Sequence, residues 1–236
     1  MGSCSGTMYA IAIDGPSGAG KSSLAQNLAE RLGFWYLDTG ALYRAFGLYV
    51  FEAGLGGGET EQIEALVDSG KIKIELAYEN RQQKVFLNGA DVSEAIRQNH
   101  ISKYASDVSK IPAVRAFLLD IQKNAAKTSN IIMDGRDIGT VILPEADLKI
   151  FLTSSPEERA KRRCEQLQKK GETADYAAIL EEINARDAQD TNRGVAPLKP
   201  AEDAMLLDNS DCGTPDETLE RVLNIVKERL PDVCIR

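Results

Sequence analysis

Residues Gly15–Ser22 read G-P-S-G-A-G-K-S, a combination of glycines, a lysine and a hydroxyl that suits phosphate binding. Glycines let the backbone curl so that several N–H groups point at one anion, and Lys21 adds a positive charge. Ser22 offers a hydroxyl to magnesium. The alternative is a chance match of common turn residues. However, the loop follows the apolar run Tyr9–Ile13 and precedes a run with leucine at every fourth residue up to Gly33, as a strand and a helix require. This context favours a nucleoside triphosphate site.

Arginines follow two of the predicted strands. Transfer of a phosphoryl group mostly requires cations that neutralise negative charge around both phosphates. Arg44 comes about one helical turn after Thr39, which we predict to cap a helix. Arg136 lies in D-G-R-D, directly after a buried strand, and ligands of parallel sheets bind at strand ends. Asp137 could pair with Arg136 or accept hydrogen bonds from an exocyclic amine, and Asp134 could simply cap a turn.

A second basic region extends over residues 155–193 of an otherwise acidic chain and could form a lid. On its second predicted helix, Arg186, Asp190 and Arg193 are spaced by four and three and share one face. The alternative is a solvated, salt-bridged surface without a catalytic part. We favour that alternative for the individual basic residues Arg159, Lys161, Lys169 and Lys170.

The elements that must position these residues alternate along the chain. Buried parallel strands are predicted at Tyr9–Ile13, Phe34–Leu37, Ile131–Met133, Leu148–Leu152 and Ala204–Leu207, with helical patterns between them. Two helix starts, at Ser155 and Thr214, have a capping hydroxyl followed by proline and glutamate. The alternation predicts an α/β fold with a five-stranded parallel sheet covered by helices on both faces.

One stretch, residues 71–97, breaks this alternation. Lys71–Leu76 and Lys84–Leu87 alternate between polar and apolar residues, and Asn88-Gly89 is a tight-turn pair. We interpret the stretch as a small antiparallel insert within a single domain over residues 1–236. Residues 1–8 are predicted to form a flexible tail, and residues 156–193 a helical lid.

Composition restricts the class of protein. The 236 residues are 43% hydrophobic, enough to bury a core, and a net charge of −8 disfavours nonspecific binding of nucleic acid. The four cysteines form no C-x-x-C pair, and no apolar run reaches the roughly 18 residues of a membrane span. The start of the sequence has no basic-then-apolar signal pattern. We therefore expect a cytoplasmic protein that does not bind membranes and, in the absence of a dimer seam, a monomer.

With these residues laid out, the sequence resembles the bacterial cytidylate (CMP/dCMP) kinase family of P-loop nucleoside monophosphate kinases along nearly its whole length. The shared motifs are I-D-G-P-S-G-A-G-K at Ile13–Lys21, L-D-T-G-A-L-Y-R at Leu37–Arg44, D-G-R-D at Asp134–Asp137 and N-R-G-V-A-P-L at Asn192–Leu198. The insert looks like the extended CMP-binding region of the bacterial branch. The resemblance implies Mg²⁺-dependent transfer of the γ-phosphoryl group of ATP to CMP or dCMP, giving CDP or dCDP.

The resemblance also implies roles for individual residues. ATP would be bound by Gly15, Pro16, Ser17, Gly18, Ala19, Gly20, Lys21, Ser22 and Ser23. The CMP phosphate would be bound by Thr39, Arg44, Arg136 and Arg193, the cytosine edge by Ser106, Arg115 and Asp137, and the ribose by Arg186 and Asp190. Lys21, Arg136, Arg186 and Arg193 would be catalytic, and Ser22 would face the metal. Some relatives have Gly-Thr where this chain has Ser22-Ser23, so either hydroxyl could meet magnesium.

Cytosine and uracil differ at the group that Asp137 would contact. Asp137 can accept a hydrogen bond from the N4 amine of cytosine, whereas Arg115 and Ser106 can donate to O2 and N3. Uracil presents an oxygen instead, which would leave a buried carboxylate unsatisfied at a cost of about 1–3 kcal/mol or more. The three residues therefore predict a preference for cytosine.

Three other functions compete with this interpretation. A kinase for another nucleotide or metabolite would share the loop but not the D-G-R-D and N-R-G-V-A-P-L motifs. A GTPase switch would be expected to contain N-K-x-D, which the sequence lacks. A catalytically idle homologue would have no need of the full arginine set.

Overall fold

The structure is a computed structural model that describes residues 8–79, 82–169 and 171–236. The chain divides into two compact units, which we describe separately. The first contains the described residues up to Phe34 together with Asn130–Arg236, and the second is Trp35–Ser129. Of the tail expected at residues 1–8, all but Met8 lies outside the described residues.

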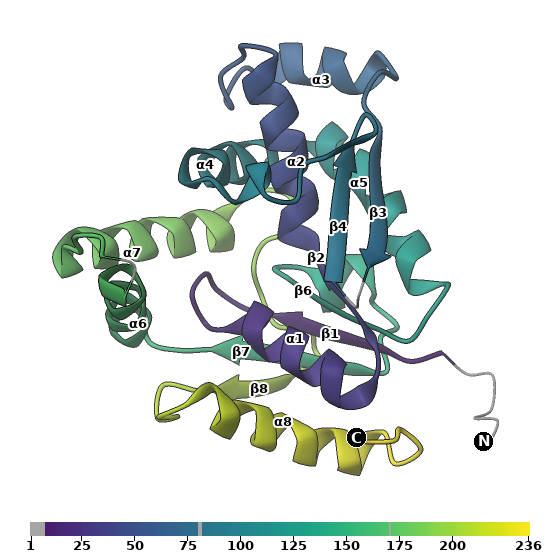
Figure 1. Cartoon of the computed structure of the whole chain (residues 1–236), viewed down its shortest axis with the longest axis vertical. Helices are drawn as coiled ribbons and strands as arrows, with labels where there is room; N and C mark the ends of the chain where they lie inside the picture. The colour runs from purple at the N-terminus through teal and green to yellow at the C-terminus, as the bar shows by residue number, and fades with distance from the viewer. Residues whose placement is uncertain (1–7, 80–81, 170) are drawn as a thin grey trace. The chain divides into compact units, whose positions relative to one another are not determined.

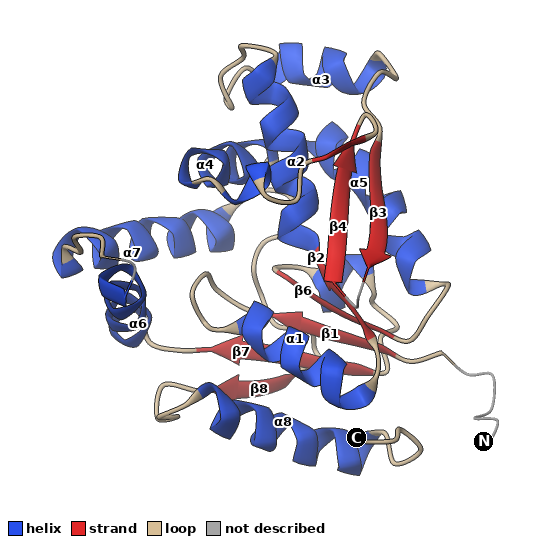
Figure 2. Cartoon of the chain, viewed as in Figure 1, coloured by secondary structure: helices blue, strands red, loops and turns tan. Residues whose placement is uncertain are grey.

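The first unit is built on parallel strands that alternate with helices (Figures 1 and 2). Its elements are β1 (Ala10–Asp14), α1 (Lys21–Leu32), β6 (Ile131–Gly135), η2 (Ile138–Ile142), β7 (Leu148–Thr153), α6 (Pro156–Lys169), α7 (Tyr176–Asn192), β8 (Met205–Asp208) and α8 (Pro215–Arg229). β1 pairs in parallel with β6 and β7, and β7 pairs with β8. With β2 (Trp35–Asp38), the strands form a five-stranded sheet in the order β2-β6-β1-β7-β8. The predicted α/β fold is confirmed, and the strand ends differ from the predicted ones by at most two residues.

Apolar side chains from the sheet and from α1 form the core of the first unit. Ile11 and Ile13 of β1 and Ile131–Met133 of β6 are fully buried, and the leucines that recur along α1 are buried as well. Both predicted helix starts are present, because the Ser155 hydroxyl accepts from the N–H of Glu158, and the Thr214 hydroxyl accepts from that of Glu217. The core therefore holds the loop after β1 between a buried strand and a buried helix face.

The second unit combines helices with a small antiparallel sheet. Besides β2, it contains α2 (Thr39–Glu52), α3 (Thr60–Asp68), β3 (Ile74–Glu79), β4 (Gln82–Leu87), β5 (Ala90–Asp91), η1 (Ala95–Arg97), α4 (Asn99–Val108) and α5 (Pro112–Ala126). The sheet has the order β3-β4-β5, and Asn88 and Gly89, with φ of 49° and 84°, make the predicted tight turn. The first strand begins at Ile74 and not at Lys71 as predicted, and Lys73 directly before it is hydrogen-bonded to Asn88 of the turn. None of the helices within the described ranges is both long and apolar enough to span a bilayer.

Candidate active site

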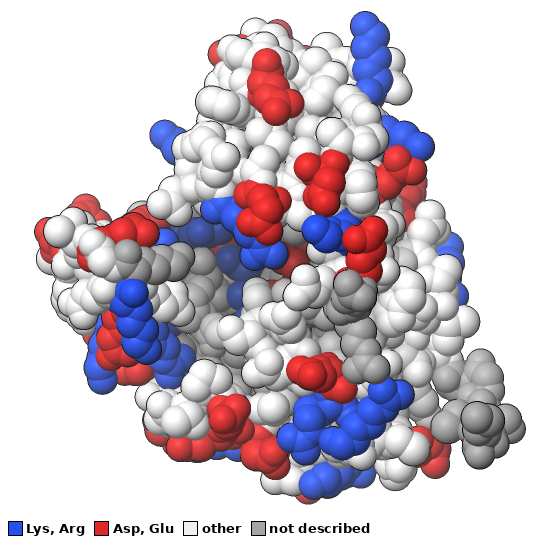
Figure 3. Space-filling view, in the orientation of Figure 1, with Lys and Arg blue, Asp and Glu red and all other residues white. Residues whose placement is uncertain are grey.

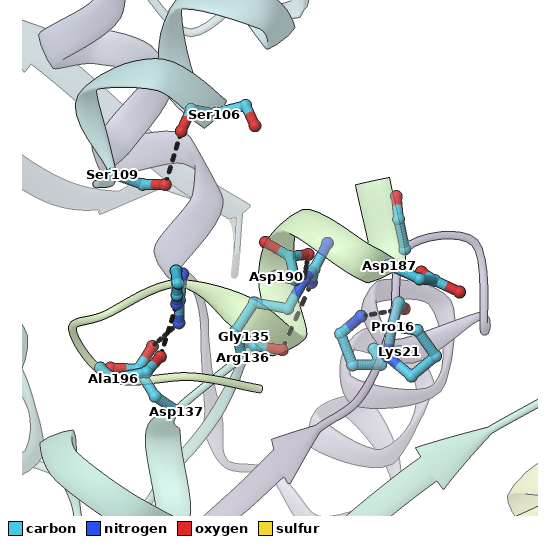
Figure 4. Close-up of polar contacts among 12 residues, drawn as sticks. Pro16, Lys21, Ser106, Ser109, Gly135, Arg136, Asp137, Asp187, Asp190 and Ala196 are labelled. Atoms are coloured by element: carbon cyan, nitrogen blue, oxygen red, sulfur yellow. Dashed lines mark hydrogen bonds and ion pairs between the residues drawn. The ribbon is translucent and has the colours of Figure 1, made fainter. Parts of the chain in front are cut away.

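The phosphate loop connects β1 to α1 and requires glycine at its first position. Gly15 has a φ of +148°, and a Cβ atom there would lie 1.9 Å from the carbonyl oxygen of Leu152. Lys21 is the first residue of α1 and is only 5% exposed. Its Nζ donates to the carbonyl oxygen of Pro16 at 2.7 Å, so the loop curls around its own lysine (Figure 4). The N–H groups at the start of α1 complete a site that suits an anion.

Burial changes the ionisation of two residues beside this loop. Desolvation, followed by the charge of Arg136, lowers the pKa of Lys21 to about 7, although Asp134 and Asp14 oppose the shift. Desolvation also raises the pKa of Asp14 to about 6, against the hydrogen bonds that its carboxylate accepts from the N–H groups of Gly139 and Ile138. The positive charge of Lys21 is thus costly without an anionic ligand.

Ser22 and Asp134 provide oxygen atoms side by side. The Ser22 hydroxyl donates to a carboxylate oxygen of Asp134 at 2.9 Å, and Asp134 is buried near the end of β6. Magnesium prefers oxygen ligands and commonly binds through one or two protein groups together with substrate phosphates and water. This donor set therefore fits a magnesium ion bound to nucleotide phosphates.

Two ion pairs connect the loop after β6 with α7 and the residues that follow it. Arg136 Nε donates to Asp190 at 2.8 Å, and Arg193 Nη2 donates to Asp137 at 3.2 Å (Figure 4). Arg193 Nε also donates to the carbonyl oxygen of Ala196. These contacts bring together four of the CMP-binding residues that the resemblance implies. Asp137 therefore forms an ion pair with Arg193, whereas the sequence had suggested Arg136 as its partner, and Arg136 pairs with Asp190.

Asp14 and Arg186 extend this arrangement. Each Asp14 carboxylate oxygen accepts from a backbone N–H directly after Asp137, which anchors that loop to the end of β1. Arg186 lies on α7, one turn before Asp190. The position of Asp190 is fixed further because its carbonyl oxygen accepts from the N–H of Leu198. The first unit thus places the phosphate loop and the residues of D-G-R-D in one hydrogen-bonded network.

In the second unit, Arg44 is held by an aspartate that the sequence analysis did not single out. Arg44 Nη2 donates to the Asp38 carboxylate at 2.5 Å. Asp38 also caps α2 by accepting from the N–H of Ala41, so the prediction that Thr39 is the cap was wrong. Thr39 is instead the first residue of α2 and is buried. The L-D-T-G motif contains two residues that can cap a helix, and the first of them does so.

The small antiparallel sheet also contacts Asp38. The Gln83 side chain on β4 accepts from the N–H of Asp38 at 2.7 Å and donates to its carbonyl oxygen at 3.3 Å. One amide thus satisfies both backbone groups of the residue that orients Arg44. Alternation along β4 predicted a strand, but nothing in the sequence indicated this contact across 45 residues.

Ser106 and Arg115 come from different helices and share a neighbour. The Ser109 hydroxyl donates to the carbonyl oxygen of Ser106 at 2.8 Å (Figure 4), and Arg115 Nη1 donates to the Ser109 carbonyl at 3.4 Å. Arg115 is buried and also lies over the Tyr43 ring, 5.7 Å from its centroid. Two residues without any local sequence signal therefore lie close together in this unit.

The expectation of a solvated surface was wrong for Arg159, which is 3% exposed. Its guanidinium donates to the carbonyl oxygens of Ser17 and Ser154 and to both carboxylate oxygens of Asp187. By contrast, Lys161 and Lys169 are exposed, and basic and acidic atoms are interspersed over α6 (Figure 3). Lys170 lies outside the described residues. The S-P-E-E-R sequence places an arginine near the start of a capped helix, and this was the only feature of the sequence that could have indicated the burial of Arg159.

Comparisons with known proteins agree with this geometry. A sequence model of the family described as cytidylate kinase matches residues 11–228. The chain is 50% identical over 215 residues to a cytidylate kinase of Caldicellulosiruptor saccharolyticus, covering 91% of this chain and 94% of that protein. It is 46% identical over 218 residues to a cytidylate kinase of Caldanaerobacter subterraneus subsp. tengcongensis, covering 92% and 94% of the two chains.

A solved shikimate kinase of Bacteroides thetaiotaomicron is a far more distant likeness, at 12% identity and a TM-score of 0.47, and covers 94% of this chain and 99% of its own. It adds nothing to the assignment. The family model spans the phosphate loop, the D-G-R-D residues and α7, all of which contribute to the network of the first unit. The chain therefore belongs to the cytidylate kinase family.

Proposed function

We propose that this chain transfers the γ-phosphoryl group of ATP to CMP or dCMP, giving ADP and CDP or dCDP. The observation that carries the proposal is the network of the first unit. Its phosphate loop is joined through Ser22 and Asp134 to the strand end that bears Arg136 and Asp137. Cations next to a phosphate loop are what phosphoryl transfer requires. Membership of the cytidylate kinase family supports the choice of acceptor.

In this proposal the phosphate loop, residues 15–23, binds the ATP phosphates, and Lys21 stabilises charge between donor and acceptor. Magnesium, held through Ser22 and Asp134, neutralises phosphate charge when bound. Arg44, Arg136 and Arg193 bind the CMP phosphate together with Thr39. The acceptor phosphate is already mostly dianionic at neutral pH, so no general base is needed.

The remaining groups select the nucleoside. Asp137, Arg115 and Ser106 contact the cytosine edge, and Arg186 and Asp190 contact the ribose. We further propose that α6 and α7, which pack against each other, form a lid that excludes water during transfer. The protein is proposed to act as a cytoplasmic monomer that binds neither nucleic acid nor membranes.

Acceptor specificity is the direct test of this function. ADP release from MgATP is measured with CMP, dCMP, UMP, AMP, GMP or no acceptor. We expect strong turnover with CMP and dCMP, little with UMP and none without acceptor. Hydrolysis independent of acceptor would favour a nucleotide-dependent switch, and transfer to another nucleotide would show that the base contacts are misassigned.

Binding of ATP is expected to be coupled to uptake of a proton by Lys21. Its pKa of about 7 in the free protein leaves Lys21 largely neutral at pH 8, whereas an adjacent triphosphate favours the charged form. Affinity for ATP should therefore fall as the pH rises above 7. Calorimetry at pH 8 in buffers of different ionisation enthalpy should show uptake approaching one proton in the wild type and little in Lys21→Arg, because arginine is always charged. Absence of uptake in the wild type would contradict the assignment.

A further inference from the structure

Arg159 is a buried cation in the first unit to which the proposed chemistry gives no role. Its Nη1 donates to the carbonyl oxygen of Ser17 in the phosphate loop at 2.9 Å, and its Nε donates to the carbonyl oxygen of Ser154, directly after β7, at 2.9 Å. The aliphatic part of the side chain lies directly under the loop, 3.5–3.7 Å from where a Cβ of Gly18 would be. Arg159 therefore holds the phosphate loop from below and does not face solvent.

The same guanidinium also holds α7. Arg159 Nη1 and Nη2 donate to the two carboxylate oxygens of Asp187 at 3.0 and 2.6 Å, which is the two-pronged geometry that only arginine provides. Asp187 follows Arg186 directly and lies one turn before Asp190. A change in the position of the guanidinium would consequently move the part of α7 that carries these two residues.

Buried apolar side chains contribute little to holding α7 in place. Among the residues of α7, all of which are described, only Asp190 is buried, and on α6 only Arg159 and Ala160 are buried. The two helices thus lack the apolar core that anchors α1, and polar contacts have a large share in positioning them. Arg159–Asp187 and Arg136–Asp190 are two ion pairs that contribute to attaching α7.

We propose that Arg159 and Asp187 are positioning residues that couple occupancy of the phosphate loop to the placement of α7, and hence couple the binding of ATP to the binding of CMP. A triphosphate on the loop fixes the Ser17 carbonyl, and through it the guanidinium and Asp187. The ordering of α7 is then already partly achieved when CMP binds. The inference rests on the proposed function, because it takes Arg186 and Asp190 to be CMP contacts.

The test is the coupling between two ligands, which a merely structural role would not change selectively. The Kd for CMP is measured by calorimetry with and without a saturating non-hydrolysable ATP analogue and Mg²⁺. The Kd without the analogue divided by the Kd with it is the coupling factor. The same factor must be obtained from the Kd of the analogue measured without and with CMP. We expect a wild-type factor of at least about five, in the range typical of coupled sites.

Arg159→Lys keeps the charge but cannot make the two-pronged contact, and Asp187→Asn keeps the shape but loses the charge. Both variants should move the coupling factor toward one. The double variant should have a factor no smaller than that of the more affected single variant, because the two substitutions remove the same interaction. The matched control is Lys161→Ala on the exposed face of α6, which should keep the wild-type factor. Melting temperatures identify any variant that is unfolded, and Asp187, which is partly exposed, offers the milder change.

A wild-type factor of one, or wild-type coupling in both folded variants, would overturn the proposal. Failure of the proposed function looks different: the wild type would bind the ATP analogue but not CMP. In that case the same ratio, measured with whichever acceptor the ADP-release assay identifies, tests the coupling by the same criteria.

Discussion

Replacement of Arg136 by alanine is expected to lower kcat on the order of 10³-fold, the size of effect seen when an arginine that stabilises the transferred phosphoryl group is lost. Arg136 directly follows β6, and its Nε donates to Asp190 at 2.8 Å, which fixes the guanidinium. Negative charge spreads over the phosphoryl oxygens during transfer, and a fixed cation stabilises that charge without reorganisation. ADP release at saturating ATP and CMP gives kcat, and circular dichroism checks the fold.

The ion pair complicates the alanine variant. Removing one partner of a largely buried pair costs about 3–5 kcal/mol, because Asp190 then loses this partner. Arg136→Lys keeps a cation there but loses the planar fork, so we expect near wild-type stability together with a large loss of turnover. Arg221→Ala is the matched control, since Arg221 and Asp211 form an exposed pair and kcat should not change.

Arg186→Ala should also lower kcat strongly. Arg186 lies on α7, one turn before Asp190, the residue that pairs with Arg136. Near wild-type kcat in folded Arg136→Lys, Arg136→Ala or Arg186→Ala would contradict the assignment of that residue.

The parts of the fold that were predictable from sequence depend on neighbouring residues. The apolar run before the phosphate loop, the leucines of α1 and the hydroxyl caps at Ser155 and Thr214 are local patterns, and the structure confirms them. The turn at Asn88-Gly89 was predictable for the same reason, because two consecutive positions need a positive φ. Periodicity and turn chemistry therefore sufficed for these elements and for the phosphate loop.

The pairing of charged groups could not be predicted in this way. Arg193 and Asp137 are 56 residues apart, and Arg159 reaches Ser17 across 142 residues. A basic residue on a polar helix has the same local sequence pattern whether it faces water or the underside of a loop. The polar composition of α6 therefore favoured an exposed Arg159, and this prediction was wrong. Roles in substrate binding came from the family resemblance, and they stay predictions until the variants are measured.

Replacement of Asp137 by asparagine is expected to reduce kcat/KM for CMP roughly 100-fold and to reduce it much less for UMP. The buried Asp137 carboxylate can accept from the N4 amine of cytosine, and asparagine replaces this charge-assisted hydrogen bond with a neutral one of roughly half the strength. We expect this change to cost about 1–3 kcal/mol, or roughly 5- to 150-fold. An asparagine amide can present either its oxygen or its NH₂ group to the base, so it no longer repels O4 of uracil.

The same variant also disturbs Arg193, whose Nη2 donates to Asp137 at 3.2 Å. That disturbance affects the phosphate end, which CMP and UMP share, so it should lower both activities by a similar factor. The ratio of kcat/KM for CMP to that for UMP cancels this shared loss and isolates the contact to the base. We expect the ratio to fall at least tenfold in Asp137→Asn, and to stay at the wild-type value in the exposed control Asp211→Asn. If both activities fell together at a constant ratio, Asp137 would act only by holding Arg193, and cytosine would have to be recognised by other groups.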